Sequence, residues 1–417
     1  MTLNQPGLAR SAMGLREFVC FVAACMAINA LAIDIVLAAL PQISDELGAA
    51  DTNDRQAVIS FYLFGLGASQ FLYGPLSDSF GRKPVLTFGL LLFAAASLFS
   101  AASTTFEMMI LSRFIQGFGA GAPRVVAMAL VRDRFVGVEM GRVMSMAMMV
   151  FMIVPILAPS IGQGILLIAP WRWMFLTLLL AGVGIALWGM FRVEETLTDE
   201  NRRSLTLANL GSGFAAAIRH PVTRGYTLAL GLVFGVLVAF ISLAQQIFQD
   251  RYGIGAGFTM LFACIAMFLT ASSFTNSRLL RRFGLVRMTW SALVGLIAIS
   301  AVWSVVAVFD QVPLALYMLL QGSCLFCFGF LGANLNALAM EPMGRNAGSA
   351  AALIGSFTTI MGTGIGYLIA QQFDGTLVPL AVGYLGMASS ALLVVVLTNR
   401  IAVKLGQPLA ASSRPAP

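Results

Sequence analysis

Three charged side chains inside long apolar runs are the residues best placed to do chemistry: Asp34, Arg113 and Arg124. Asp34 lies among Ile, Leu and Ala, where burial disfavours the ionised form of a carboxyl group. Such a group could bind a proton on one side of a membrane and lose it on the other. A structural Asp bonded to Arg or to backbone groups is the alternative. The single histidine, His220, falls in a polar segment, which argues against a histidine relay.

The two arginines belong to one predicted helix and share one of its faces. Arg113 opens the stretch Arg-Phe-Ile-Gln-Gly-Phe-Gly-Ala-Gly, in which Gln116 and Gly117 lie on the same side as Arg113. Arg124 follows eleven residues later, and at about 3.6 residues per turn it returns to within about 20° of that face. This polar stripe is expected to face a cavity rather than lipid. Arg124 could contact an anionic substrate group or form a salt bridge.

The amino-acid composition indicates which class of protein holds these charged residues. Of the 417 residues, 59% are hydrophobic and 10% are charged, whereas a soluble domain carries roughly 25% charge. These values, with a mean hydropathy of +0.88, exclude a soluble enzyme, a nucleic-acid binder, a disulfide scaffold and a disordered chain. No G-K-[ST] phosphate-binding motif occurs, so ATP is not expected to drive the protein. No enzymatic activity, metal or cofactor is expected.

Twelve apolar runs are long enough to cross a membrane as helices, since about 20 residues span the hydrocarbon core. The fold class is therefore an all-α integral membrane protein. The runs cover residues 18–40, 57–77, 85–104, 107–131, 142–168, 173–192, 225–248, 257–277, 287–309, 312–338, 347–372 and 377–399.

The basic residues predict the orientation of these helices. With the N-terminus in the cytoplasm, 20 of the 25 Lys and Arg residues fall in cytoplasmic segments. Only Arg55, Arg172 and Arg251 fall in outer segments, so both termini are expected in the cytoplasm.

A long polar break divides the helices into six plus six. It predicts an N-terminal bundle over 1–193, a cytoplasmic loop over 194–223, a C-terminal bundle over 224–400 and a cytoplasmic tail over 401–417. Phe80-Gly81 recurs as Phe283-Gly284, and Gln116-Gly117 as Gln321-Gly322, at separations of 203 and 205 residues. These similar separations favour an internal duplication.

Cys324 and Cys327 form a C-x-x-C pair, but it lies within an apolar helix and no second Cys/His pair is near. Packing is the favoured interpretation over redox or metal chemistry. Glycine runs such as Gly117, Gly119 and Gly121 are likewise assigned to helix packing, because they follow no strand.

The segment between the second and third helices carries a family resemblance. Its residues Gly74, Asp78, Gly81, Arg82 and Lys83 resemble the G-x-L-x-D-x-x-G-R-K signature of the major facilitator superfamily, where this loop acts as a conformational latch. The sequence departs from the family at position 79, where Ser replaces a frequent Arg. The second-half copy, 276–284, keeps the glycine and the cations but has Asn where an acid would stand.

Two further motifs extend the resemblance. The stretch from Arg113 resembles the family's R-x-x-Q-G-x-G-A signature, which implies a role in proton transfer and drug binding. The fifth helix resembles the antiporter signature, and its form Ala-Pro-x-x-Gly is typical of the Bcr/CflA drug-resistance branch. The motif residues there are Pro155, Ala158, Pro159 and Gly162, and the two prolines are expected to kink the helix.

The resemblance implies two pseudo-symmetric six-helix bundles around a cavity. It also implies proton-coupled efflux of small amphipathic compounds by alternating access, in a monomer of the bacterial inner membrane that binds no nucleic acid. Proton coupling is assigned to Asp34 and Arg113. A dedicated exporter or symporter of one metabolite, such as an amino acid or sugar, is the alternative; a non-transporting sensor is a third. The candidate cavity residues are Asn29, Asp34, Gln70, Arg113, Gln116, Arg124, Gln245, Gln246, Asn334 and Asn336.

Overall fold

The computed structural model describes residues 13–197, 202, 215, 217–255, 257–309 and 312–406. Within these ranges it is helical and contains no strand. Twelve helical segments in the described part are long and apolar enough to cross a membrane, which confirms the predicted fold class.

The elements fall into two sets along the chain. The first set is α1 (Leu15–Asp34), η1 (Ile35–Ala39), α2 (Leu40–Leu47), η2 (Thr52–Gln56), α3 (Ala57–Phe80), α4 (Arg82–Ala101), α5 (Phe106–Arg134), α6 (Gly137–Ile168) and α7 (Arg172–Arg192). The second set is α9 (Pro221–Gln246), η4 (Ile247–Arg251), α10 (Phe258–Phe283), α11 (Leu285–Val308), α12 (Leu314–Met340), η5 (Glu341–Asn346), α13 (Ala347–Gln371) and α14 (Val378–Lys404).

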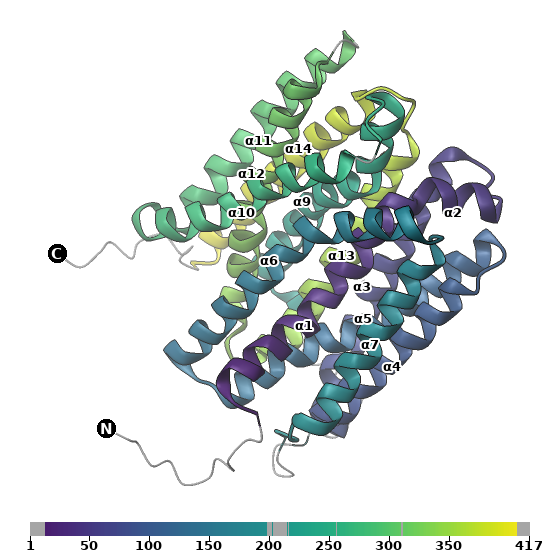
Figure 1. Ribbon diagram of the computed structural model, residues 1–417. Coiled ribbons are helices and arrows are strands. Elements are labelled where there is room, and N and C mark those ends of the chain that lie inside the picture. The colour runs from purple at the N-terminus through teal and green to yellow at the C-terminus, as the bar shows by residue number, and fades with distance from the viewer. Residues whose placement is uncertain are drawn as a thin grey trace.

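Each set packs mainly on itself, and so the chain forms two bundles. In the first half α5 packs along α3 and α4, and α1 packs along α6; in the second half α9 packs along α12, α13 and α14. The halves meet where α3 contacts α13 and α6 contacts α10. Figure 1 shows the two bundles as a purple-to-teal group and a green-to-yellow group.

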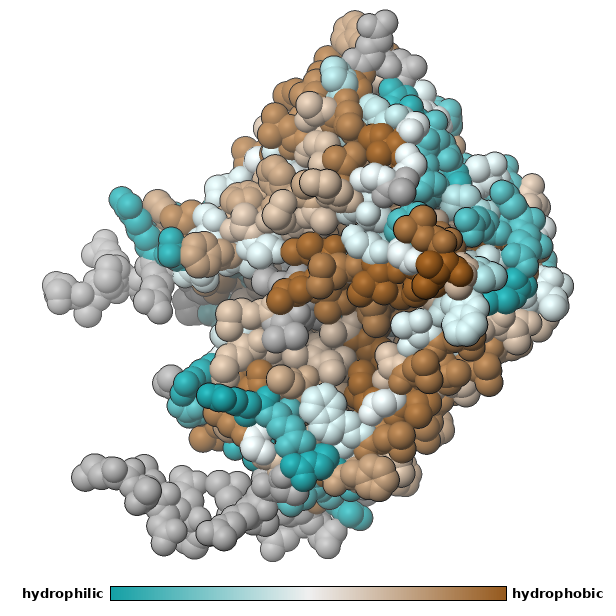
Figure 2. All heavy atoms as spheres, in the orientation of Figure 1, coloured by the Kyte–Doolittle hydropathy of each residue, from teal (hydrophilic) through white to brown (hydrophobic). Residues whose placement is uncertain are grey.

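The two ends of the molecule are distinguished by the chain termini. The start of α1 and the end of α14 lie at one end of the bundles, here called the termini end (Figure 1). The opposite end carries α2 and η2 and is called the η2 end. Apolar residues cover much of the middle of the face in Figure 2, and hydrophilic residues gather toward both ends.

The predicted domain boundaries are only partly visible. Most of the loop predicted over 194–223 lies outside the described residues, as does the tail from 407 onward. The helix α9 begins at Pro221, earlier than the predicted boundary at 224, because His220 caps its first turn and proline suits that turn.

The first membrane-crossing segment is not one regular helix. It is α-helical to Asp34, continues as the 3-10 helix η1 and resumes as α2, whose first turn contains Pro41. Proline has no backbone N–H, so Pro41 cannot donate to the carbonyl four residues earlier and disfavours a continuous α-helix here. The 3-10 segment that precedes Pro41 begins directly after Asp34.

Glycines bring the first-half helices into close contact. A Cβ atom at Gly117 would overlap the backbone carbonyl of Tyr62 in α3, and one at Gly119 would overlap the backbone of Phe93 in α4. A Cβ atom at Gly121 would overlap the side-chain oxygen of Ser69 in α3. The predicted packing role of these glycines is confirmed.

Candidate functional site

Asp34 is the deepest acid in the described part of the chain and lies at the junction of α1 and η1. It is 4% exposed, and the residues that follow it in η1 are all buried and apolar. No described residue donates a hydrogen bond to its carboxyl group or forms an ion pair with it, so the alternative of a locked structural Asp has no support in this structure.

The predicted motif of the fifth helix packs against this junction. A Cβ atom at Gly162 of α6 would overlap the carbonyl oxygen of Ile35, the residue after Asp34. Ala158 and Pro159 are also buried, one turn earlier on α6. Gly162 therefore fixes how closely α6 can approach the backbone that carries Asp34.

Arg113 lies fully buried between three helices. Its Nη2 donates to the carbonyl of Ala32 at 3.0 Å, its Nε donates to the carbonyl of Val58 at 2.9 Å, and its Nη1 donates to Gln116 Oε1 at 2.5 Å. The guanidinium also stacks on the Tyr62 ring, with its carbon 4.5 Å from the ring centroid. All three acceptors are neutral, so Arg113 joins α1 to α3 and α5 without an ion pair.

Gln116 takes part in the same internal network rather than facing a cavity. Its Nε2 donates to Ser97 Oγ of α4 at 2.7 Å, and the residue is fully buried. This position differs from the predicted cavity lining. The physical reason is that a buried guanidinium needs hydrogen-bond acceptors, and the amide three residues later supplies one.

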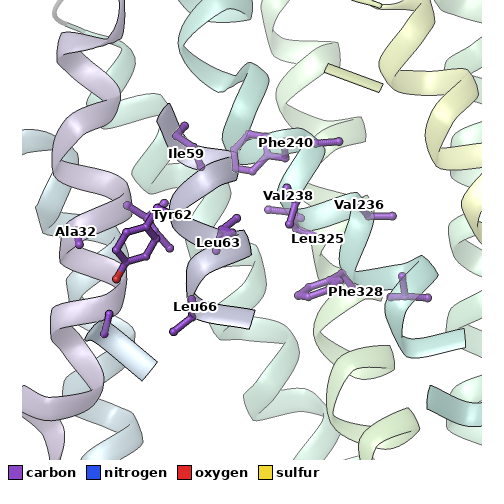
Figure 3. Packing of buried hydrophobic residues seen from close by; sticks show 14 of the residues in the cluster. Ala32, Ile59, Tyr62, Leu63, Leu66, Val236, Val238, Phe240, Leu325 and Phe328 are labelled. Carbon is purple, nitrogen blue, oxygen red and sulfur yellow. The ribbon is translucent and has the colours of Figure 1, made fainter. Parts of the chain in front are cut away.

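Tyr62 lies near all three candidate charged residues, and sequence reasoning missed it. It lies within electrostatic range of Asp34, Arg113 and Arg124. Its hydroxyl donates to Asn29 Oδ1 at 3.4 Å, and Asn29 Nδ2 is buried without a partner. Figure 3 shows the Tyr62 side chain extending from α3 toward α1 near Ala32. We call Asn29, Asp34, Tyr62, Arg113 and Arg124 the Tyr62 cluster.

Arg124 differs from Arg113 in its surroundings. It is exposed although it lies within α5 between the buried residues Pro123 and Val126. It forms no ion pair with any residue that the structure describes. An exposed guanidinium in the middle of a membrane-length helix requires water or a polar ligand at that position.

The remaining candidates lie apart from the Tyr62 cluster, and most of them bond residues outside the candidate set. Asn334 and Asn276 exchange amide hydrogen bonds of 3.0 and 3.1 Å inside the second half. Gln245 donates to Gln249 at 2.7 Å, Asn336 is exposed, and Gln70 lies against Gly355 of α13 with its Nε2 unpartnered.

Gln246 belongs to a set of polar contacts that joins the halves at the η2 end. Its Nε2 donates to Asn53 Oδ1 at 2.8 Å, and Asn53 Nδ2 donates to the carbonyl of Phe373 at 2.9 Å. Arg55 of the first half forms an ion pair with Asp250 of the second half, and Gln56 donates to Gln246. We call this set the η2-end interlock.

The predicted latch forms a charge network at the termini end. Arg82 bonds Asp78 at 2.5 Å and Asp133 at 2.9 Å, and its own backbone N–H donates to Glu195 Oε1 at 2.9 Å. The backbone N–H of Lys83 donates to Glu195 Oε2 at 3.1 Å. Glu195 therefore caps the start of α4, a role that sequence reasoning did not assign.

Glycine is required at one point of this loop, position 81. Gly81 has φ +103°, and a Cβ atom there would meet the Glu195 carboxylate. Gly74 lies on the side of α3 that faces α13, where a Cβ atom would be 3.9 Å from Ala352. The network and the contact between halves are thus held on adjacent turns of α3.

Comparison with known proteins gives a family. The sequence profile described as Major Facilitator Superfamily matches residues 22–366. A protein named multidrug resistance protein MdtL, from Shewanella sp., is 30% identical and covers 78% of this chain and 81% of its own. The bicyclomycin resistance protein homolog of Haemophilus influenzae is 29% identical, over 84% of this chain and 87% of its own.

A solved structure agrees in fold. The xylose transporter XylE from E. coli, in a partially occluded inward-open conformation, superposes with a TM-score of 0.70 at 10% identity. The match covers 93% of this chain and 97% of that chain, so the two proteins share the overall fold.

Proposed function

Because this chain belongs to the Major Facilitator Superfamily and is therefore a multi-pass membrane transporter rather than an enzyme, we propose that it exports small amphipathic compounds in exchange for protons. The proposal places it in the bacterial inner membrane, as a monomer. The names of its relatives, which refer to multidrug and bicyclomycin resistance, support export of toxic compounds.

The observation that carries the proposal is the isolated carboxyl group of Asp34. It is buried, has no described partner and lies where α1 changes to the 3-10 helix η1. A carboxyl group without a fixed cation can exchange its proton when the local conformation admits water. We assign proton binding to Asp34.

Arg113 is assigned a positioning role in this coupling. Its bond to the carbonyl of Ala32 holds the last turn of α1, and its bond to the carbonyl of Val58 fixes α3 beside it. Movement of Asp34 during proton exchange would therefore be transmitted to α3 and α5. No step requires Arg113 to lose its own proton.

Alternating access would use the two polar networks at opposite ends. We propose that the η2 end faces outward and is closed by the η2-end interlock, while the termini end faces the cytoplasm. The latch at Asp78 and Arg82 would then help select between the two conformations. The concentration of Lys and Arg near the termini end supports this orientation.

A second candidate function follows from Arg124. An exposed guanidinium without an ion pair in the described chain can bind a carboxylate, as in an amino acid or another acidic metabolite. A dedicated exporter of one such anion would require this cation. Amphipathic substrates without an acid would not require it, so the effect of Arg124→Gln on different compounds separates the two functions.

The central test replaces the carboxyl group that carries the proposal. Asp34→Asn should abolish substrate-induced proton movement in everted membrane vesicles, because the amide cannot bind and release a proton at working pH. Asp45→Asn, an equivalent change of an exposed acid in α2, should leave proton movement intact. Undiminished proton movement in Asp34→Asn would refute the coupling role.

A further inference from the structure

A pocket of about 440 Å³ lies in the second half, away from the Tyr62 cluster. The helices α10 and α11 both pack along α12 but contact one another little, so α12 forms the floor between them. Its apolar walls include Leu279, Phe283, Met288, Phe326, Cys327 and Phe330, and Arg287 is its charged residue. Phe283 and Arg287 place one part of the pocket at the turn between α10 and α11.

The turn at this pocket carries several cations and no acid close to them in the sequence. Arg278, Arg281, Arg282 and Arg287 occur within ten residues of sequence, and no Asp or Glu occurs from Arg251 to Phe309. Arg278 and Arg282 lie over the rings of Phe274 and Phe283. Arg287 is exposed and forms no ion pair with a described residue.

The equivalent turn of the first half is neutralised by the protein itself. There the side chain of Arg82 bonds Asp78 and Asp133, and Glu195 accepts from the backbone N–H groups of Arg82 and Lys83. The second-half turn keeps the cations and has lost these acids. No acid among the described residues forms an ion pair with Arg287, so an anion from outside the chain can neutralise it.

We propose that the pocket binds an anionic phospholipid, with the phosphodiester on Arg287 and an acyl chain between α10 and α11. A guanidinium donates charge-assisted hydrogen bonds to phosphate oxygens, and basic pockets between membrane helices suit anionic headgroups. The apolar walls at Leu279, Phe283 and Phe326 provide the surface that an acyl chain covers. This assignment depends on the membrane location of the helices and not on the transported substrate.

Cys327 provides a reporter inside the pocket. The experiment uses full-length protein in which Cys20, Cys25, Cys264 and Cys324 are replaced by Ala, reconstituted in nanodiscs of phosphatidylcholine alone or with phosphatidylglycerol. Reaction of Cys327 with a maleimide should be about fivefold slower when phosphatidylglycerol is present. This factor corresponds to about 1 kcal/mol, which is the typical attraction between one cation and an anionic lipid surface. Arg287→Gln should remove the difference between the two lipids.

A matched control and a second measurement decide the outcome. Arg142→Gln removes an exposed cation near the start of α6, in the first half, and should preserve the lipid dependence. Native mass spectrometry of the protein with its natural cysteines should show retained phosphatidylglycerol that Arg287→Gln releases and Arg142→Gln keeps. Equal labelling in both lipids, loss of lipid in both variants, or protection of Cys327 by a transported compound in pure phosphatidylcholine would overturn the proposal.

Discussion

At the scale of single residues, the two buried charges of the Tyr62 cluster, Asp34 and Arg113, differ in their surroundings. Arg113 is surrounded by acceptors, whereas Asp34 has no described donor. A cation that keeps its charge needs such acceptors in a region that excludes water. A carboxyl group that must gain and lose a proton works best without a fixed partner. This contrast is why we assign the proton to Asp34 and the fixed geometry to Arg113.

Replacement of Arg113 tests this division of roles. Arg113→Met should lower the free energy of unfolding by on the order of 3 kcal/mol, because Gln116 Oε1 loses its donor and the carbonyls of Ala32 and Val58 each lose a charge-assisted hydrogen bond. Thermal unfolding of the purified protein in detergent measures the change. Arg142→Met, which removes an exposed cation, should leave the melting temperature nearly unchanged. Equal stability of the two variants would contradict a structural role for Arg113.

The sequence revealed these two residues because a charge in an apolar run is rare. It did not reveal Tyr62 or the unpartnered amide of Asn29 as neighbours, since one aromatic among 31 Phe, 7 Tyr and 5 Trp residues carries no distinguishing pattern. Tyr62 lies on α3 and Asn29 on α1, so their contact depends on how the two helices pack and has no signal in the local sequence. Gln116 was placed on the correct helix face, but its partners Arg113 and Ser97 are internal to the bundle.

At the scale of elements, prolines have different effects on the helices. The first membrane-crossing segment changes helix type before Pro41, whereas α6 contains two prolines without such a change. The kinks at Pro155 and Pro159 stay a prediction, and α6 is a single α-helix that contains both prolines. Proline position alone therefore did not predict the 3-10 segment that presents Asp34.

The contact between α6 and η1 gives an element-scale prediction. Gly162→Ala should lower stability by roughly 1–3 kcal/mol and slow transport, because the added methyl group overlaps the carbonyl of Ile35 and forces the two elements apart. Gly164→Ala, two residues later on α6, meets nothing within 4 Å and serves as the control. Melting temperature and uptake into everted vesicles measure both effects. If the two alanine variants behave alike, close packing at Ile35 is not required.

The start of α4 gives a second element-scale prediction. Glu195→Ala should lower stability by about 1 kcal/mol, because two backbone N–H groups lose their acceptor at the positive end of the helix dipole. Thermal unfolding checks the loss. Glu139→Ala removes an exposed carboxylate whose distance to Arg142 is 3.9 Å, and it should change the melting temperature little. A similar loss in both variants would point to net charge rather than capping.

At the scale of the whole molecule, the sequence predicted the number of helices and the division into halves but not how the halves meet. Hydropathy and composition identify membrane-length helices because lipid imposes their length. Contacts such as Asn53 with Phe373 join residues 320 positions apart, and polar side chains near helix ends have no local signature. The η2-end interlock was therefore visible only in three dimensions.

The interlock predicts how the equilibrium between the two conformations responds to charge. Arg55→Glu places a second acid beside Asp250 and should favour opening of the η2 end. A cysteine at position 246, now buried between the halves, should then react faster with a membrane-impermeant maleimide, by a factor of about five if the pair contributes about 1 kcal/mol. Rates measured on whole cells report accessibility from the outer side only.

The exchange of both charges separates this electrostatic effect from local damage. The double variant Arg55→Asp with Asp250→Arg restores an attractive pair and should return the labelling rate toward that of the parent. Arg172→Glu breaks an ion pair with Glu46 at the same end but within the first half, so it should leave the rate unchanged. Faster labelling in Arg172→Glu, or no recovery in the exchanged pair, would mean that the Arg55–Asp250 contact does not hold the η2 end closed.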